Sequence, residues 1–363
     1  MEKYSHTAKN PPPPSIPMKN WVGDKGKIIV PLFADYFLRQ HPMRCFQGRL
    51  FTVDGMIEDE TPLKKGIYEQ VRYYATTSVA RRIEHIMQAI KLACASEPPE
   101  IQTDRIHVRN GTYFVGSHFT PEKEYCMNRL PIAYVPEAPA PTRWLQFLNE
   151  LLYEEDIPAL QEYIGYCLLP VTKAQKMLLM VGKDGEGKSR IGLILRELFG
   201  SSMYTGSLQK VETNRFARAD LEYKLLLVDD DMKTEALPQT NNIKTLVTLE
   251  DKIDIERKGQ QSVQGTLYVR FACFGNGSLH ALYDKSNGFY RRQLLLTTKE
   301  KPVGRVDDPF LIEKMRNEKE GILLWALEGL HRLIRNNYQF TISERTAANL
   351  KEAMEQGNNI LGF

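Results

Sequence analysis

The sequence of 363 residues lacks the features of a membrane or secreted protein. Its longest apolar runs, such as Ile322–Leu327, are far too short to cross a bilayer. Residues 1–10 are polar and contain no apolar core of the kind found in signal peptides. The five cysteines are scattered and form no CxxC pair, which argues against a zinc site or a disulfide framework and favours a reducing compartment. We therefore expect a cytoplasmic protein with no membrane contact.

A large excess of one charge is also missing. The chain carries 48 Lys and Arg against 45 Asp and Glu, a net charge of +3. This is a mild lean toward nucleic acid, because non-specific DNA binding needs only a local stripe of basic residues. Internal repeats are absent as well, and the length favours two or three domains.

Composition and periodicity divide the chain into four parts. We expect a flexible proline-rich tail at 1–20, a smaller, mainly helical α+β domain at 21–140, an α/β core with a parallel sheet at 141–300 and a helical segment at 301–363. The expected helices are 30–39, 77–95, 144–152, 157–169, 189–198, 309–335 and 343–355. The expected strands are 49–56, 106–108, 112–115, 176–181, 225–228, 268–274 and 293–297, with a hairpin turn at Asn110-Gly111.

The clearest motif is a glycine-rich loop between a strand and a helix. The run Gly182-Lys183-Asp184-Gly185-Glu186-Gly187-Lys188-Ser189 satisfies the pattern GxxxxGK[ST] fully. In such a loop the backbone N–H groups wrap phosphates at a helix N-terminus, the lysine adds positive charge, and the serine hydroxyl can bind Mg²⁺. Asp184 and Glu186 are expected to be solvated. The motif predicts a site for ATP and Mg²⁺.

Carboxylates follow a second apolar strand. Leu225–Val228 runs directly into Asp229-Asp230-Asp231. A P-loop enzyme needs one acid at such a strand tip to hold Mg²⁺ and another to orient the attacking water. We assign Asp229 to the metal and Asp230 to the water. The three consecutive aspartates leave this assignment open by one residue.

Two further polar positions flank the last predicted strands. Asn276 follows the strand ending at Phe274, where it is either a turn residue or a ligand of the γ-phosphate or the water. Arg291 and Arg292 precede the strand Gln293–Thr297. They are either a surface pair or, in a ring-shaped ATPase, a finger that reaches the site of the neighbouring subunit.

These elements, in this order and spacing, resemble a superfamily 3 helicase, a branch of the AAA+ ATPases. Phrases outside the P-loop look like those of phage and plasmid primase-helicases: Met127–Pro131, Leu160–Tyr166 and Phe216–Leu221. The resemblance covers roughly residues 105–300. It implies an AAA+ core, a homo-hexameric ring, ATP-driven movement on single-stranded DNA and a possible primase partner, in a bacterial cell or another host of the mobile element.

The resemblance also implies roles for single residues. Lys188 and Ser189 match the Walker A lysine and hydroxyl, and Asp229 and Asp230 match the Walker B pair. Asn276 matches the sensor asparagine. Arg292, with Arg291 next, matches the arginine finger. Arg257 and Lys258 match a hairpin that grips single-stranded DNA in the ring channel; without the family, an exposed turn with solvated charges is the favoured interpretation of this stretch.

Two other functions share the P-loop. An origin-binding initiator or loader would use its ATPase as a switch without processive unwinding. A small-molecule kinase would leave Asn276 and the paired arginines unexplained. We expect the replicative helicase, and duplex-origin affinity compared with strand displacement separates it from the initiator.

Overall fold

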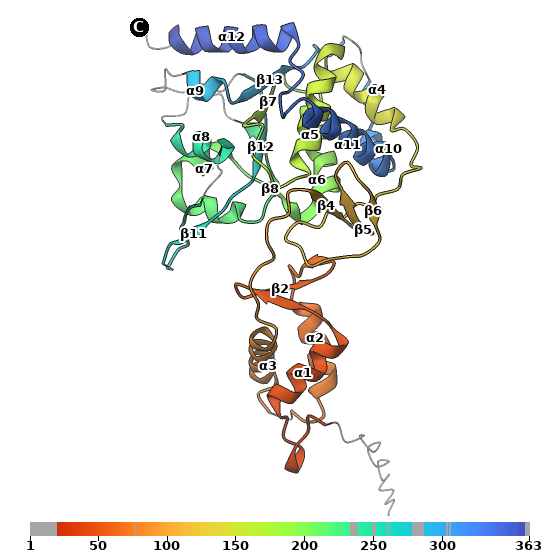
Figure 1. The fold of residues 1–363 in the computed structure, drawn as a ribbon, viewed down its shortest axis with the longest axis vertical. Helices are drawn as coiled ribbons and strands as arrows, with labels where there is room; N and C mark the ends of the chain where they lie inside the picture. Colours follow the sequence, from red (N-terminus) through yellow and green to blue (C-terminus); the bar gives the residue numbers. More distant parts are fainter. Residues whose placement is uncertain are drawn as a thin grey trace, which may run out of the picture. The chain divides into compact units, whose positions relative to one another are not determined.

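The computed structural model describes residues 20–75, 77–232, 239–248, 252–259, 261–277, 287–302, 304 and 306–359. The tail expected at 1–20 lies outside the described residues except for Asn20. Contacts divide the chain into two compact units (Figure 1). The first comprises the chain up to Thr52 together with Met56–Pro98, and the second comprises Val53–Gly55 together with Pro99–Phe363. Within the part that is described, no helix is long and apolar enough to cross a membrane.

The first unit is a small α+β fold around an aromatic core that includes Trp21, Phe33 and Phe37. Its helices are α1 (Val30–Gln40), α2 (Thr61–Val71) and α3 (Val79–Ala93), preceded by the short turn of helix η1 (Asp24–Gly26). Its strands are β1 (Arg44–Phe46) and β2 (Arg49–Thr52), and β3 (Gly55–Met56) lies where the two units meet in sequence. The turn between β1 and β2 places Gln47 and Gly48 at positive φ, as a tight hairpin requires.

The second unit is built on a five-stranded sheet with the order β13-β7-β12-β9-β8. The strands are β7 (Met177–Val181), β8 (Met203–Thr205), β9 (Leu226–Met232), β12 (Arg270–Gly275) and β13 (Gln293–Thr297). All neighbours in this sheet pair in parallel. The expected parallel α/β sheet is confirmed; β8, at its edge, was not predicted.

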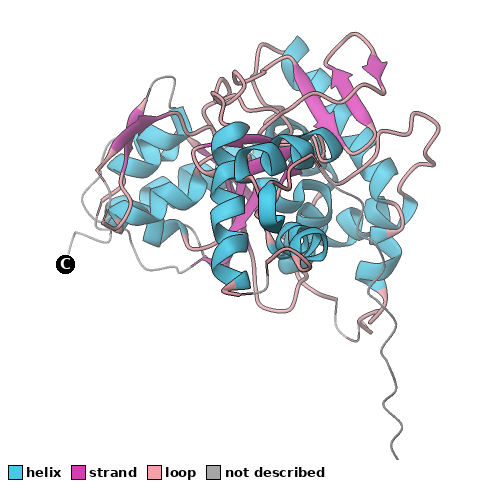
Figure 2. Cartoon of the chain, turned by 90° about the horizontal axis from the view of Figure 1, so that it is seen from below, coloured by secondary structure: helices cyan, strands magenta, loops and turns pink. Residues whose placement is uncertain are grey.

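Helices cover both faces of this sheet, and Figure 2 shows the strands lying between them. One face packs against α4 (Thr142–Leu151), α5 (Ile157–Cys167), α6 (Lys188–Phe199), α10 (Leu311–Arg316) and α11 (Lys319–Arg335). The other packs against α7 (Leu208–Thr213), α8 (Asn241–Thr248) and α12 (Glu344–Asn359). The remaining short elements are η2 (Glu154–Asp156), η3 (Gly200–Ser202), η4 (Arg215–Leu221), β10 (Ile253–Ile255), β11 (Val263–Gly265) and α9 (Asn287–Tyr290).

The C-terminal helices are part of the second unit, although the sequence suggested a separate segment from 301. Helices α5 and α11 approach each other closely at two glycines. A Cβ atom on Gly165 would lie 2.3 Å from the carbonyl oxygen of Ala326, and one on Gly329 would lie 2.4 Å from that of Gln161. In addition, the Glu318 carboxylate accepts the backbone N–H groups of Arg143 and Trp144 at the start of α4. Because of this packing, the C-terminal helices form part of the second unit and not a separate domain.

A three-stranded antiparallel sheet also belongs to the second unit. It consists of β4 (Arg105–Val108), β5 (Gly111–Phe114) and β6 (Phe119–Thr120), and it confirms the hairpin predicted at Asn110-Gly111. Ile106 and Val108 join the same core as helix α6. The first unit therefore ends at Pro98, whereas the sequence suggested a boundary at 140, because apolar residues of this small sheet are buried against the larger one.

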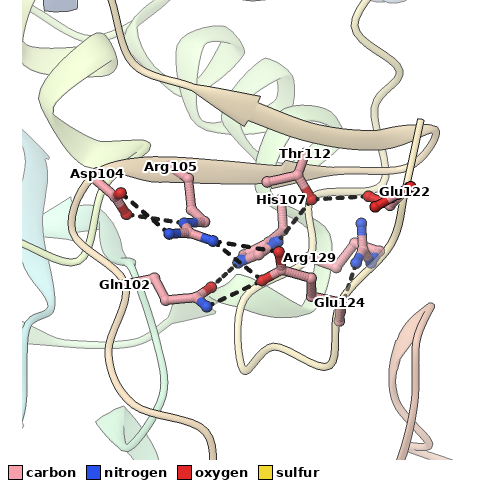
Figure 3. A network of polar contacts seen from close by, with 8 residues as sticks. All are labelled: Gln102, Asp104, Arg105, His107, Thr112, Glu122, Glu124 and Arg129. Carbon is pink, nitrogen blue, oxygen red and sulfur yellow. Dashed lines mark hydrogen bonds and ion pairs between the residues drawn. The ribbon is translucent and has the colours of Figure 1, made fainter. Parts of the chain in front are cut away.

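A buried polar network fixes this small sheet (Figure 3). The Arg129 guanidinium donates to the carbonyl oxygens of Val108 at 2.6 Å and Gly111 at 3.0 Å. His107 lies beside it, with Nε2 2.5 Å from the Gln102 side-chain oxygen. Burial, followed by the nearby Arg129 charge, lowers the pKa of His107 to about 4. His107 is therefore an uncharged structural residue near neutral pH.

Candidate nucleotide-binding site

The glycine-rich loop begins at the end of β7 and passes directly into α6. Gly185 and Gly187 have φ values of +77° and +119°, a region that only glycine enters without strain. The loop thus has the strand before it and the helix after it that phosphate binding at a helix N-terminus requires. The predicted local structure is confirmed.

Lys188 lies inside this loop. Its ammonium group donates to the carbonyl oxygens of Gly182 at 2.8 Å and Lys183 at 2.7 Å. Burial of the side chain lowers its pKa, and the negative charges of Glu186 and Asp184 act in the opposite direction. The ammonium is held where anionic oxygens of a ligand can replace the backbone acceptors. Ser189, one residue on, is exposed in the first turn of α6.

The remaining loop side chains fall into two groups. Lys183 and Asp184 are exposed, and Lys183 forms an ion pair with the exposed Glu300. Glu186, expected to be solvated, is instead only 3% exposed. Its carboxylate accepts a hydrogen bond from the hydroxyl of Thr298, the residue that follows β13. The expectation was wrong because the loop folds back against the end of the neighbouring strand.

The acidic strand places its first two aspartates differently. Asp229 pairs with Cys273 of β12, and the register then shifts before Gly275. The Asp229 carboxylate is 6% exposed, accepts the backbone N–H of Leu208 at 2.7 Å, and has a pKa raised by burial. It is therefore engaged at the start of α7, a position that does not fit the metal role expected from the sequence.

Asp230 lies on the side of the P-loop helix. It is exposed, and a Cβ atom built on Gly192 of α6 would lie 3.8 Å from its Oδ1. Successive side chains of a strand point to opposite faces, so Asp229 and Asp230 diverge. Of the two, Asp230 is the carboxylate that borders the helix carrying Ser189.

Asn276 joins the same edge of the sheet. It follows β12, which lies between β7 and β9, and its amide donates to the Asp184 carboxylate at 2.7 Å. Lys188, Asp230 and Asn276 thus come from the carboxyl ends of three adjacent parallel strands. This edge is where open α/β sheets bind their ligands.

Arg291 and Arg292 lie at the other end of the sheet. They precede β13, whose Gln293 pairs with Met177 and whose Thr297 pairs with Val181 at the start of the P-loop. Six residue steps along the strand pair separate Arg292 from the start of the loop, a distance of roughly 20 Å. Arg291 is exposed, while Arg292 is half-buried and donates to the carbonyl oxygen of Gly288. The structure does not bring either arginine to the P-loop of its own chain.

The predicted hairpin at 252–264 is confirmed as the antiparallel pair β10 and β11. Lys258 is exposed in its turn. Arg257 instead forms an ion pair with Glu222, whose side chain is 5% exposed. The neighbouring Glu256 pairs with Arg215 at 3.3 Å. Arg257 therefore anchors the hairpin to the segment around η4, which does not fit the DNA contact expected for it.

Two residues of the site region, Thr298 and Glu222, were not predicted from the sequence. Thr298 could have been found, because a residue that follows a strand next to the P-loop strand in a parallel sheet lies beside the loop. Nothing in the sequence pairs Glu222 with Arg257.

Comparisons with known proteins agree with this architecture. Residues 180–292, from β7 to Arg292, match a family of unknown function (DUF5906). No curated protein matches the sequence. An apo structure of the NrS-1 C-terminal region aligns with 13% identity and a TM-score of 0.56, over 89% of this chain and 74% of that one. Another apo structure of that region aligns with 13% identity and a TM-score of 0.55, over 89% and 75%. The chain therefore shares the fold of the NrS-1 C-terminal region.

Proposed function

We propose that the chain is the ATP-driven motor of a ring-shaped DNA helicase of superfamily 3, acting in the replication of a phage, plasmid or other mobile element. The observation that carries the proposal is a division of groups across the sheet. Lys188, Asp230 and Asn276 gather at one edge, whereas Arg292 lies at the opposite end of β13. A finger that cannot reach its own loop can serve a neighbouring copy.

ATP would lie in the loop Gly182–Gly187. The backbone N–H groups and Lys188 would hold its phosphates. The exposed hydroxyl of Ser189 and the exposed carboxylate of Asp230 are oxygen donors of the kind that Mg²⁺ prefers, and they lie on the same helix side of the sheet. Bound there, Mg²⁺ neutralises charge that develops on the phosphate oxygens.

The sequence suggested that Asp229 binds the metal and Asp230 orients the water. We reassign these two roles to the residues one position later, Asp230 and Asp231. Asp230 takes the metal role. The register of β9 shifts against β12 after Asp229, which would allow the exposed Asp231 to lie on the same side as Asp230 and polarise the attacking water. Asn276 is placed to donate to the γ-phosphate or to this water once the loop is filled, in exchange for its present contact with Asp184. Among the described residues, neither Arg291 nor Arg292 can reach this site within its own chain, so positive charge beyond that of Lys188 would come from a neighbouring copy.

Arg292 supplies it from the next subunit. A contact between different surfaces of identical chains closes into a ring, and a hexamer is the form that the superfamily resemblance implies. Hydrolysis at each interface would move the β10–β11 hairpins, and Lys258 at their turns would hold the backbone of single-stranded DNA. A primase, on the same polypeptide or separate, remains a proposed partner in the cytoplasm of the host.

Three single variants test this function. We expect Lys188→Ala to abolish ATP hydrolysis and strand displacement, because the phosphates lose the buried ammonium group of the loop. Arg292→Ala should abolish hydrolysis while leaving nucleotide binding intact. Lys183→Ala, in the same loop but exposed and paired only with an exposed glutamate, is the matched control and should remain active.

Hydrolysis stimulated by single-stranded DNA together with strand displacement would support the helicase. Tight binding to duplex origin DNA without strand displacement would assign the chain to the initiator class. Normal hydrolysis by Lys188→Ala would end the proposal.

A further inference from the structure

Strand β13 connects two functional positions. Arg292 precedes its first residue, and Thr298 follows its last. Between them the strand is paired residue by residue with β7, from Gln293 with Met177 to Thr297 with Val181. A parallel pair in unbroken register transmits a displacement of one end to the other as a rigid body.

Thr298 forms hydrogen bonds with the P-loop and with the residue before it. Its backbone N–H donates to the carbonyl oxygen of Val181 at 3.0 Å, and its hydroxyl donates to the Glu186 carboxylate. A Cβ atom on Gly182 would lie 1.6 Å from that hydroxyl. The first glycine of the motif is thus required by Thr298 together with the Glu186 carboxylate, whose Oε2 would lie 2.2 Å from the same Cβ atom.

Glu186 is an unusual residue to bury in a loop that holds phosphates. A carboxylate 3% exposed costs free energy unless it is hydrogen-bonded, so the position of its partner constrains the loop strongly. The second link from this region, between Lys183 and Glu300, is fully solvated on both sides and constrains the loop little.

We propose that Thr298 is a positioning residue that latches the Glu186 carboxylate to β13 and thereby couples the shape of the P-loop to the strand that carries Arg292. The inference rests on the proposed function for the role of Arg292, but the latch itself is a property of one chain. When Arg292 engages the nucleotide of the next subunit, β13 and the latch change the affinity of its own loop.

The latch has a second consequence for binding. The Glu186 carboxylate also borders the loop, since a Cβ atom on Gly182 would lie 2.2 Å from its Oε2 and its charge acts on Lys188. The hydrogen bond from Thr298 offsets part of this negative charge. Without the hydroxyl, the carboxylate loses this hydrogen bond, and its charge repels a bound triphosphate more strongly. Replacing Glu186 with an uncharged residue should therefore restore part of the nucleotide affinity that is lost with the Thr298 hydroxyl.

The test compares the full-length chain with four variants: Thr298→Val, Thr298→Ser, Glu186→Gln and the double variant Thr298→Val/Glu186→Gln. Valine keeps the volume of threonine and loses its hydroxyl, while serine keeps the hydroxyl. Two quantities are measured: the affinity for a non-hydrolysable ATP analogue and the Hill coefficient of ATP hydrolysis. Native mass spectrometry checks that each variant assembles as the wild type does.

We expect Thr298→Val to weaken analogue binding by about tenfold and to lower the Hill coefficient from above 1 to about 1. Thr298→Ser should behave as the wild type. The double variant should regain affinity but not cooperativity, because the charge is gone while the link remains broken. A merely structural role for Thr298 would not separate these two quantities.

Unchanged affinity and cooperativity in Thr298→Val, or a double variant no tighter than Thr298→Val, would overturn the latch. A wild-type Hill coefficient of 1 would overturn the coupling. Failure of the helicase proposal looks different: the wild type would show no stimulation by single-stranded DNA, while the analogue-binding measurements would still decide the latch.

Discussion

The side-chain amide of Asn276 donates a 2.7 Å hydrogen bond to the carboxylate of Asp184, joining the tip of β12 to the P-loop. The contact holds the Asn276 amide beside the loop. Because Asn276 comes from the strand between β7 and β9, it lies between the phosphate-binding loop and the acidic strand.

Substitutions of Asn276 and of Asp184 should have different effects on the kinetics of ATP hydrolysis. Asn276→Ala should lower kcat for ATP hydrolysis by about a hundredfold with little change in KM, because a donor aimed at the reacting phosphate acts mainly in the transition state. Asp184→Ala is the control, since it removes the partner of Asn276 and leaves the amide itself in place, and should keep kcat within about twofold. Equal losses in both variants would show that Asn276 serves only to shape the loop.

The two neighbouring aspartates of β9 should respond differently to the same change. Asp230→Asn should reduce ATP hydrolysis by about a hundredfold or more, because it weakens a metal ligand. Asp229→Asn should retain activity, because an amide oxygen can still accept the N–H of Leu208. Steady-state rates at varied Mg²⁺ concentrations measure both. A dead Asp229→Asn with an active Asp230→Asn would restore the assignment made from the sequence.

Substitutions of Arg257 and of Lys258 should also have different effects, one on stability and the other on DNA binding. Arg257→Ala leaves the buried Glu222 carboxylate without its ion pair and should lower the free energy of unfolding by roughly 2 kcal/mol, less than for a fully buried pair because Arg257 is partly exposed. Lys258→Ala should leave thermal stability unchanged and weaken binding to single-stranded DNA by about tenfold, with a smaller dependence on salt. Thermal denaturation and DNA titrations at two salt concentrations distinguish the roles; a stable Arg257→Ala with lost DNA binding would reverse them.

His107 should make stability depend on pH. Its pKa is about 4 in the folded chain, against an ordinary value of 6.5. The unfolded chain therefore binds a proton that the folded chain does not as the pH falls below about 6.5. Stability should decline from there toward pH 4, by on the order of 3 kcal/mol at the full extent. Unfolding curves across this range measure the effect.

Variants assign the effect to this residue. His107→Gln should flatten the pH dependence, whereas His118→Gln, at an exposed position of the same small sheet, should retain it. A slope that survives His107→Gln would point to another group.

The parallel sheet could be predicted because each of its strands except β8 contains a short apolar run, as burial on both faces requires. Strand β8 and helix α7 were missed because they are short and their pattern mixes polar and apolar residues; tertiary packing, including the Asp229 contact with Leu208, holds them. Helix α2 was missed for a similar reason, since its polar residues interrupt the apolar spacing.

The part of the candidate site that is formed by neighbouring residues in the sequence could be predicted. The P-loop is one continuous segment, and its spacing specifies its structure. The directions of Asp229 and Asp230 were not predictable, because the register of β9 shifts against β12 between them and the strand end. Arg257 pairs with Glu222, which lies 35 residues earlier in the sequence. Glu186 is buried against Thr298, which lies 112 residues later. Such pairings arise only on folding.

The central claim is that one chain binds ATP and an adjacent copy completes its cleavage, and mixing two inactive variants tests it most directly. Lys188→Ala retains Arg292, and Arg292→Ala retains the P-loop. Mixed in equal amounts and allowed to assemble, they should regain up to roughly a quarter of the wild-type ATPase, from interfaces that join an intact loop to an intact finger. No recovery in rings shown by native mass spectrometry to contain both variants would contradict the account.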